Sequence, residues 1–250
     1  LWHLLGAAVV VLGCTLIAVR AVPTLPELGD ADATGTADAT GPAGASIPAT
    51  RVPWRERLRE SLSVWADLHL ILIGVVMLGM AFAEGSAGDW LPLAVVDGHH
   101  QSNAAGAITF GVFMAAMTIG RVAGGPVVDR FGRVAAIRAT SVLGVVGLLI
   151  FILTSAPWLV ILGTVLWGLG ASLGFPLGMS AAADDSAHAA ARVSAVAMIG
   201  YCAFLVGPPL IGFLGQTFGL LNALFVILVL LVAAGLAAPA VRQASRARTR

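Results

Sequence analysis

Charged residues are scarce in this 250-residue sequence, and lysine is absent altogether. Asp, Glu, Lys and Arg together make up 11% of the chain, and the fourteen basic residues are all arginines. A soluble domain of this length has about a quarter of its residues charged. The arginines are also spread along the chain rather than clustered, so no nucleic-acid partner is expected.

Cysteine is equally scarce, with only Cys14 and Cys202, each alone inside an apolar run. This placement predicts packing residues rather than a disulfide or a metal site. His99 and His100 follow Asp97, but no further ligand arrives at a recognisable spacing, so we expect neither a metal nor a cofactor. No paired carboxylates, histidine cluster or nucleophile–base pair appears on one face, which ranks a membrane enzyme last among the possible functions.

Long apolar runs are what the sequence does contain. Hydrophobic residues make up 58% of it, and its mean hydropathy is +0.94. A helix needs about 20 apolar residues to cross the hydrocarbon core of a bilayer. Runs of this kind are found at residues 1–19, 62–83 with an extension to 96, 104–128, 134–154, 158–182, 193–214 and 220–240. The fold class predicted is an all-α integral membrane protein with seven transmembrane helices.

The segment between the first and second runs has a different composition. Residues 21–50 are mostly Ala, Gly, Thr, Pro and Asp, with almost nothing to bury, which is typical of a flexible linker. We therefore predict a transmembrane helix at 1–20, a largely disordered cytoplasmic linker at 21–61, a six-helix transmembrane domain at 62–241 and a basic cytoplasmic tail at 242–250. The chain begins at Leu1 and its first methionine is Met77, which we interpret as a cut through a longer protein.

The arginines predict how these helices are oriented. Apart from Arg121, they lie before the second run, around the turn between the third and fourth, between the fifth and sixth, and in the tail, whereas the alternate loops contain none. By the positive-inside rule the basic loops are cytoplasmic, and so is the C-terminus. The prediction is a multi-pass protein of the inner (cytoplasmic) cell membrane.

One short cytoplasmic turn combines glycines, an aspartate and arginines. It runs from residue 125 to 133 as Gly-Pro-Val-Val-Asp-Arg-Phe-Gly-Arg, and its characteristic residues are Gly125, Asp129, Arg130, Gly132 and Arg133. Gly125 would permit a close helix crossing, Asp129 would accept hydrogen bonds from an arginine or a helix N-terminus, and Gly132 would allow a tight reversal. Arg130 and Arg133 would hold the turn at the inner face. A plain positive-inside hairpin explains the arginines but neither the aspartate nor the glycine spacing.

This turn closely resembles the signature loop of the major facilitator superfamily, which joins the second and third helices of its members and, in weaker form, the eighth and ninth. Residues 200–212 resemble the eleventh helix of that family and residues 170–176 the tenth. The resemblance implies that the chain is helix six, the central linker and helices seven to twelve of a 12-helix transporter. The implied partners are the lipid bilayer, a small-molecule substrate and the missing N-terminal half. The turn would act as a gate motif.

Glu84 and Asp89 are the acidic candidates for a substrate or proton site. Ionisable groups within membrane helices are costly and mark functional sites. Counted from residue 62, Glu84 lies about 33 Å along a helix, so an outer-surface position and a cavity position both stay open. The stretch 84–90 resembles fucose-permease-like and sugar or drug transporter members of the family. On an unbroken helix the two carboxylates point about 140° apart, so at most one lines the cavity, and Glu84 is favoured.

Three further polar residues are candidates for the same site. Arg121 would pair with Asp129 or extend to the inner surface. Tyr201 and Asn222 would hydrogen-bond a substrate or, more simply, a neighbouring helix. The stretch 184–186, Asp-Asp-Ser, is interpreted as helix capping. In lipid the hydrophobic effect does not drive helices together, so their association depends on close packing of the backbones, which small residues allow. The glycines expected at helix contacts are Gly120, Gly124, Gly125, Gly163, Gly170 and Gly174.

These features predict a secondary active transporter that moves a small molecule by alternating access and is coupled to protons. The alternative is a membrane-embedded receptor or assembly module that keeps the fold without transport. Binding without flux would distinguish the second from the first.

Overall fold

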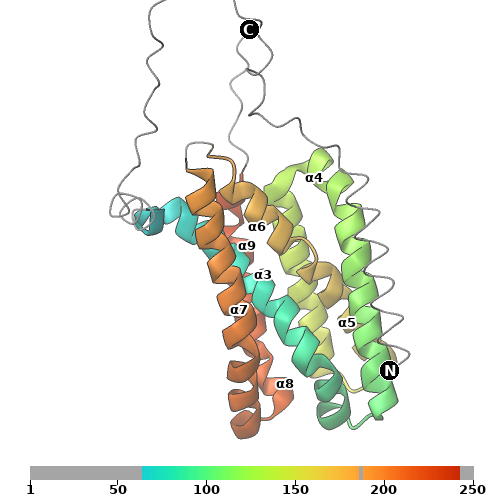
Figure 1. The fold of residues 1–250 in the computed structure, drawn as a ribbon. Coiled ribbons are helices and arrows are strands. Elements are labelled where there is room, and N and C mark those ends of the chain that lie inside the picture. Colours follow the sequence, from blue (N-terminus) through green and yellow to red (C-terminus); the bar gives the residue numbers. More distant parts are fainter. Residues whose placement is uncertain (1–63, 186–187, 243–250) are drawn as a thin grey trace, which may run out of the picture. The chain divides into compact units, whose positions relative to one another are not determined.

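The computed structural model of the chain describes residues 64–185 and 188–242, all of which belong to one compact unit, Arg51–Arg250. The described part is helical throughout and has no strand. Figure 1 shows its long helices packed side by side. The elements in chain order are η1 (Val64–Ala66), α3 (Leu68–Leu93), η2 (Ala94–Gly98), α4 (Asn103–Leu153), α5 (Pro157–Ala171), α6 (Gly174–Ala182), α7 (Ala189–Phe218), α8 (Leu220–Ala223), α9 (Phe225–Ala237) and η3 (Ala238–Val241).

Five helical segments of the described part are long and apolar enough to cross a membrane. They are Leu68–Gly98, Asn103–Leu153, Pro157–Ala182, Ala189–Phe218 and Leu220–Val241. The all-α membrane class is therefore confirmed. The predicted helix at residues 1–19 and most of the linker lie outside the described residues, so the count of seven and the domain limits stay predictions.

The second of these segments is two spans joined at Gly132. Its 51 residues would make a rod of about 76 Å, more than twice the thickness of the hydrocarbon core. Gly132 interrupts it with φ 81° and ψ 163°, a backbone conformation open almost only to glycine. The chain reverses there, and the returning half of α4 is visible behind the first in Figure 1. The predicted spans at 104–128 and 134–154 correspond to these halves.

One predicted span is broken where the sequence suggested a continuous helix. Residues 158–182 form α5 and α6, separated at Ser172 and Leu173. Pro176 has no backbone N–H to donate to the carbonyl of Ser172 four residues earlier. That carbonyl consequently lacks an intrahelical partner in the middle of a membrane helix.

Helix α3 forms the centre of the core. Its buried residues include Ile73, Met77 and Met80, and it packs against α4, α6, α7 and α9. The second half of α4 packs closely against α5, and glycines face each other where the two helices cross.

Small residues make this crossing possible. A Cβ added to Gly170 would overlap the backbone of Gly144. The predicted glycine contacts are confirmed except at Gly125, where an added Cβ would meet nothing within 4 Å in the described part of the chain, whereas Gly124 packs against Leu173.

Candidate functional site

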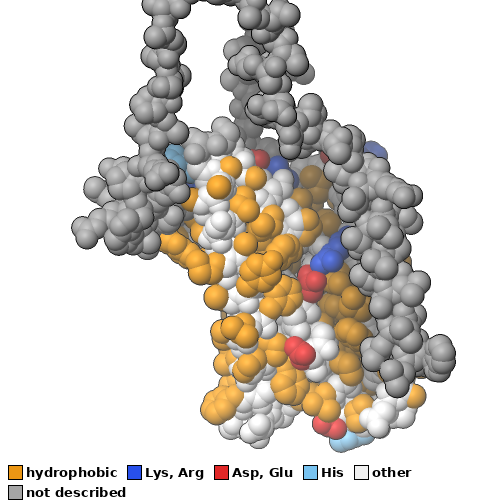
Figure 2. All heavy atoms as spheres, in the orientation of Figure 1, with side chains coloured by type: hydrophobic (Ala, Val, Ile, Leu, Met, Phe, Trp, Pro, Cys, Tyr) orange, Lys and Arg blue, Asp and Glu red, His pale blue; other side chains and the backbone are white. Residues whose placement is uncertain are grey.

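An ion pair joins two of the apolar helices. Nη2 of Arg121, on the first half of α4, lies 2.8 Å from Oε1 of Glu84 on α3. The Glu84 side chain is 19% exposed and that of Arg121 43%. Figure 2 shows acidic and basic side chains adjoining in the middle of a largely apolar face. The pair is therefore partly exposed on one face of the described bundle.

The break between α5 and α6 supplies a third group to this site. Nε of Arg121 donates a hydrogen bond to the carbonyl of Ser172 at 3.3 Å. This is the carbonyl that Pro176 leaves without an intrahelical donor. Gly120 adjoins Ser172, since a Cβ added to this glycine would lie 2.7 Å from that of the serine, so the helices approach closely enough for the arginine to reach it. The structure thus brings together α3, α4 and the α5–α6 break around one guanidinium.

Glu84 lies near the middle of its span. Helix α3 begins at Leu68, rather than at residue 62 as the sequence suggested. Glu84 is thus about 24 Å from the start of this span and about 21 Å from its end at Gly98. Glu84 is therefore several turns from both ends of this helical segment, and its outer-surface and cavity positions both stay predictions. A role in transport is a separate matter and remains a proposal.

The predicted partner of Arg121 is also wrong. The structure pairs Arg121 with Glu84 instead of Asp129, whose carboxylate is exposed and has no hydrogen bond or ion pair in the described part of the chain. Arg121 and Asp129 are eight residues apart on one helix, which separates them by about 12 Å along the axis. Arg121 also does not extend to the inner surface. The packing of α3 against α4, which the sequence does not show, decided its partner.

The other candidates do not join this pair. Asp89 lies on the same unbroken helix as Glu84 and is exposed. Tyr201 on α7 is 65% exposed, and its ring centroid lies 6.3 Å from that of Phe175. The side-chain amide of Asn222 donates to the carbonyl of Phe218 at 2.8 Å, and Asn222 adjoins Asp97 in a pocket at the far end of the bundle.

The motif turn makes a contact that the sequence did not suggest. Arg133 is buried, and its guanidinium donates to the carboxylate of Asp184 and to the hydroxyl of Ser180 at 2.8 Å. The turn is thereby tied to the end of α6. Interpreting Asp184 as a helix cap is wrong, since α7 begins at Ala189 with no side-chain cap. Arg130 remains exposed, with its guanidinium carbon 5.4 Å from the centre of the Phe131 ring.

A second ion pair, missed by sequence reasoning, lies at the same end of the bundle. Arg192 of α7 is buried and pairs with Asp67, whose carboxylate also caps α3 by accepting from the N–H of His69 at 2.9 Å. The hydrogen bond from Arg192 holds the pKa of Asp67 below its ordinary value of 3.8. The partners are 125 residues apart, so no local pattern connects them. This pair fastens the start of α3 to α7.

The Asp67–Arg192 pair makes stability depend on pH in acid. Because the folded-state pKa of Asp67 is lowered, its stabilisation is present above pH 3.8 and is lost as pH falls through the folded-state pKa. We expect Asp67→Asn to lower the free energy of unfolding at pH 7 by about 1 kcal/mol through loss of the ion pair, because asparagine can still cap the helix. The difference from wild type should shrink below pH 3.8. Thermal unfolding in detergent measures both effects, and Asp97→Asn is the matched control; an equal loss at all pH values would contradict the assignment.

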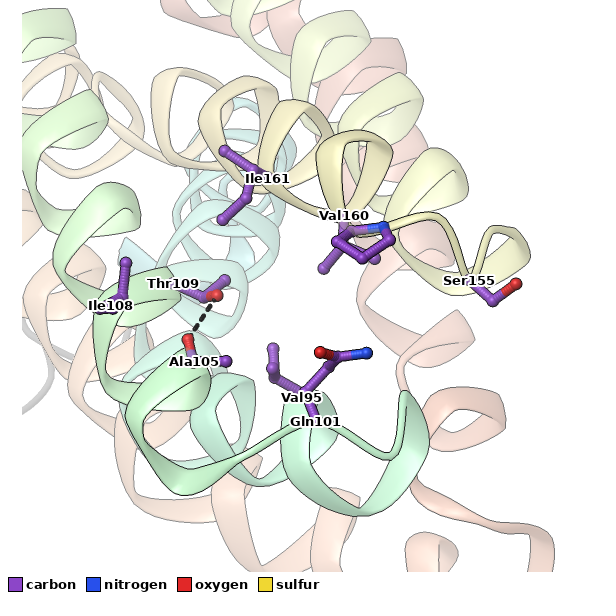
Figure 3. Close-up of a pocket in the computed structure, with 9 residues that line it drawn as sticks. Val95, Gln101, Ala105, Ile108, Thr109, Ser155, Val160 and Ile161 are labelled. Carbon is purple, nitrogen blue, oxygen red and sulfur yellow. Dashed lines mark hydrogen bonds between the residues drawn. The ribbon is translucent and has the colours of Figure 1, made fainter.

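A pocket near the loop 99–102 is not part of the site. It measures about 180 Å³ and lies between the start of α4 and the start of α5. Figure 3 shows it lined by Val95, Ile108 and Ile161, with the Thr109 hydroxyl bonded to the carbonyl of Ala105 rather than directed at a ligand.

His99 is buried near this pocket against Phe151, and burial lowers the pKa of its imidazole. No group of three or more metal-ligating side chains occurs within residues 64–185 and 188–242.

Comparison with known proteins gives a consistent result. The family model of the Major Facilitator Superfamily matches residues 2–203 and 91–249. An uncharacterised MFS-type transporter of Yersinia pestis is 31% identical over 69% of this chain and 45% of its own length. An uncharacterised transporter of Sinorhizobium fredii is 29% identical over 78% of this chain and 54% of its own. A membrane protein of Rhizobium meliloti, MosC, is 26% identical over 68% and 42%.

The chain thus spans about half the length of the curated relatives it matches. Two of them are named as transporters and none as an enzyme. With the apolar spans of residues 64–185 and 188–242, the Gly132 turn and the family match taken together, this chain belongs to the Major Facilitator Superfamily of membrane transporters.

Proposed function

We propose that the chain is the C-terminal half of a proton-coupled transporter that moves a small molecule by alternating access. The observation that carries the proposal is the Glu84–Arg121 ion pair, positioned midway along its helices and open on one side. A charge at this depth costs at least about 2.5–3.5 kcal/mol, so its retention favours a functional role. The missing N-terminal half is proposed to cover the open side and to complete the pathway. The inner membrane and a cytoplasmic C-terminus, inferred from the arginines, belong to the same proposal.

In this mechanism the proton and the substrate meet at Arg121. When Glu84 is ionised, its carboxylate occupies Nη2 of Arg121. A proton on Glu84 removes the charge attraction, and the guanidinium is then free to donate to an oxygen of the substrate. Nη1 of Arg121 has no partner among the residues that the structure describes, so it offers donors even before that exchange. The bond from Nε to Ser172 keeps the guanidinium in place throughout.

The turn at Gly132 is the proposed gate element. Arg133 ties it to α6 through Asp184, whereas Asp129 is exposed. An exposed carboxylate at the end of a helix suits a contact with an arginine or a helix N-terminus of the missing half. Such a contact would form in one gate state and break in the other. Asp129 would therefore affect the rate of switching more than the binding of substrate.

Transport by the full-length protein tests the proposal. Proteoliposomes holding a pH-sensitive dye and an imposed pH gradient are exposed to a panel of sugars, amino acids and organic acids. We expect at least one solute to cause proton entry, and Asp129→Asn to slow that entry about tenfold without weakening the solute's thermal stabilisation of the protein. Asp97→Asn is the control. Stabilisation by a solute without any flux would instead indicate a receptor.

A further inference from the structure

A groove of about 320 Å³ runs between the second half of α4 and α9. Its α4 residues recur at the spacing of one helical face, and the same holds on α9. The residues lining it are Arg138, Ser141, Val142, Val145, Val146, Leu231, Val232, Gly235 and Leu236. None of them belongs to the Glu84–Arg121 site, which is built on other elements.

The groove has a floor of small residues and an apolar rim. Ser141 and Gly235 meet at the floor, where a Cβ on Gly235 would lie 3.1 Å from that of Ser141. Val142 and Leu236 stand on the rim at 60% and 76% exposure. In a membrane protein this shape exposes an apolar channel to lipid tails. Larger side chains at the floor would fill it.

One end of the groove carries a single positive charge. Arg138 is exposed and has no hydrogen bond or ion pair with any residue of 64–185 and 188–242. It follows the turn residue Gly132 by six positions, about 9 Å along the helix, so it lies near the end of its span where headgroups are expected. Basic pockets between membrane helices at this depth are suited to phosphate headgroups.

We propose that this groove binds an anionic phospholipid, with one acyl chain between α4 and α9 and its phosphate on Arg138. The charge of Arg138 complements the phosphate, and the groove below it is apolar. The proposal requires only that the protein lie in a membrane, and it is independent of transport.

Native mass spectrometry of the full-length protein in detergent tests the proposal. The probes are phosphatidylglycerol and phosphatidylcholine with identical acyl chains. We expect the wild type to bind phosphatidylglycerol about fivefold more tightly, the effect of one arginine near an anionic headgroup. Arg138→Gln should abolish this preference. Arg242→Gln is the matched control, because Arg242 is exposed beyond the last helix and does not line the groove.

A groove-filling variant tests where the acyl chain lies. Val142→Trp should weaken the binding of both lipids, because it fills the channel without changing a charge. Should this variant fail to fold, Leu236→Trp fills the groove from the opposite rim. The proposal is overturned if the wild type binds both lipids equally, if Arg242→Gln lowers the preference as much as Arg138→Gln, or if a dimer covers the groove and excludes lipid.

Discussion

Glu84→Gln in the full-length transporter is expected to abolish accumulation driven by a pH gradient while leaving exchange of substrate intact. A gradient of one pH unit is worth about 1.4 kcal/mol, so a carrier coupled to one proton concentrates a neutral solute about tenfold. Glutamine cannot gain or lose the proton, and the accumulation ratio should fall to about one. Exchange needs no net proton movement and should continue, because the amide leaves Arg121 permanently free of its counter-charge.

The control for this experiment lies on the same helix. Asp89 is five residues beyond Glu84, exposed, and on a different face of α3. Asp89→Asn removes an equal charge and should preserve the tenfold accumulation expected for one proton per pH unit. Accumulation and exchange are measured with the solute identified in the proteoliposome panel. If Glu84→Gln still accumulates the solute fully, or if Asp89→Asn loses accumulation, Glu84 is not the proton site.

Gly147→Leu is expected to prevent the domain from folding. A Cβ at this position would overlap the backbone nitrogen of Trp167 and lie 2.6 Å from the carbonyl oxygen of Gly163. Backbone atoms of a packed helix cannot rotate away as a side chain can, so α4 and α5 would have to separate. Overpacking of a core costs about 1–3 kcal/mol when side chains can adjust, and this site exceeds that range. The measurement is the yield of monodisperse protein after detergent extraction.

A matched substitution at a second glycine of α4 distinguishes the effect of steric overlap from the effect of replacing a glycine in this helix. A Cβ added to Gly111 would meet nothing within 4 Å among the residues that the structure describes, so Gly111→Leu should preserve the yield. Gly147→Ala, which adds one carbon, should fall between wild type and Gly147→Leu. A normal yield from Gly147→Leu would mean that the α4–α5 crossing is looser than the structure shows.

The membrane fold could be predicted from sequence because its signals are local. The spans at 104–128 and 134–154 follow from apolar runs of bilayer length, and the turn between them follows from Gly132 and its arginines. The break at Ser172 was locally encoded by Pro176 but was not predicted. The sequence shows that Pro176 lacks a backbone N–H. The consequence became clear only from the structure, where Arg121 donates to the carbonyl of Ser172.

The partners of the ionisable residues depend on how the helices are rotated and packed. Arg121 pairs with Glu84, Arg133 with Asp184 and Arg192 with Asp67, and each pair joins residues far apart in the chain. An apolar helix gives little sign of which face meets which neighbour, since every face is compatible with lipid or protein. Gly125 illustrates the limit, because its neighbour Gly124 is the residue that makes the close contact.

By itself the sequence predicted that lipid surrounds this protein, the order of the apolar spans in residues 64–185 and 188–242 and the reversal at Gly132, because hydrocarbon thickness and backbone conformation act on neighbouring residues. Only the tertiary structure decided that Glu84 lies at mid-span against Arg121, and that Arg138 stands at the head of an apolar groove. Both arrangements arise from the contact of helices, and the energy of such contacts depends on three-dimensional packing rather than on position along the chain.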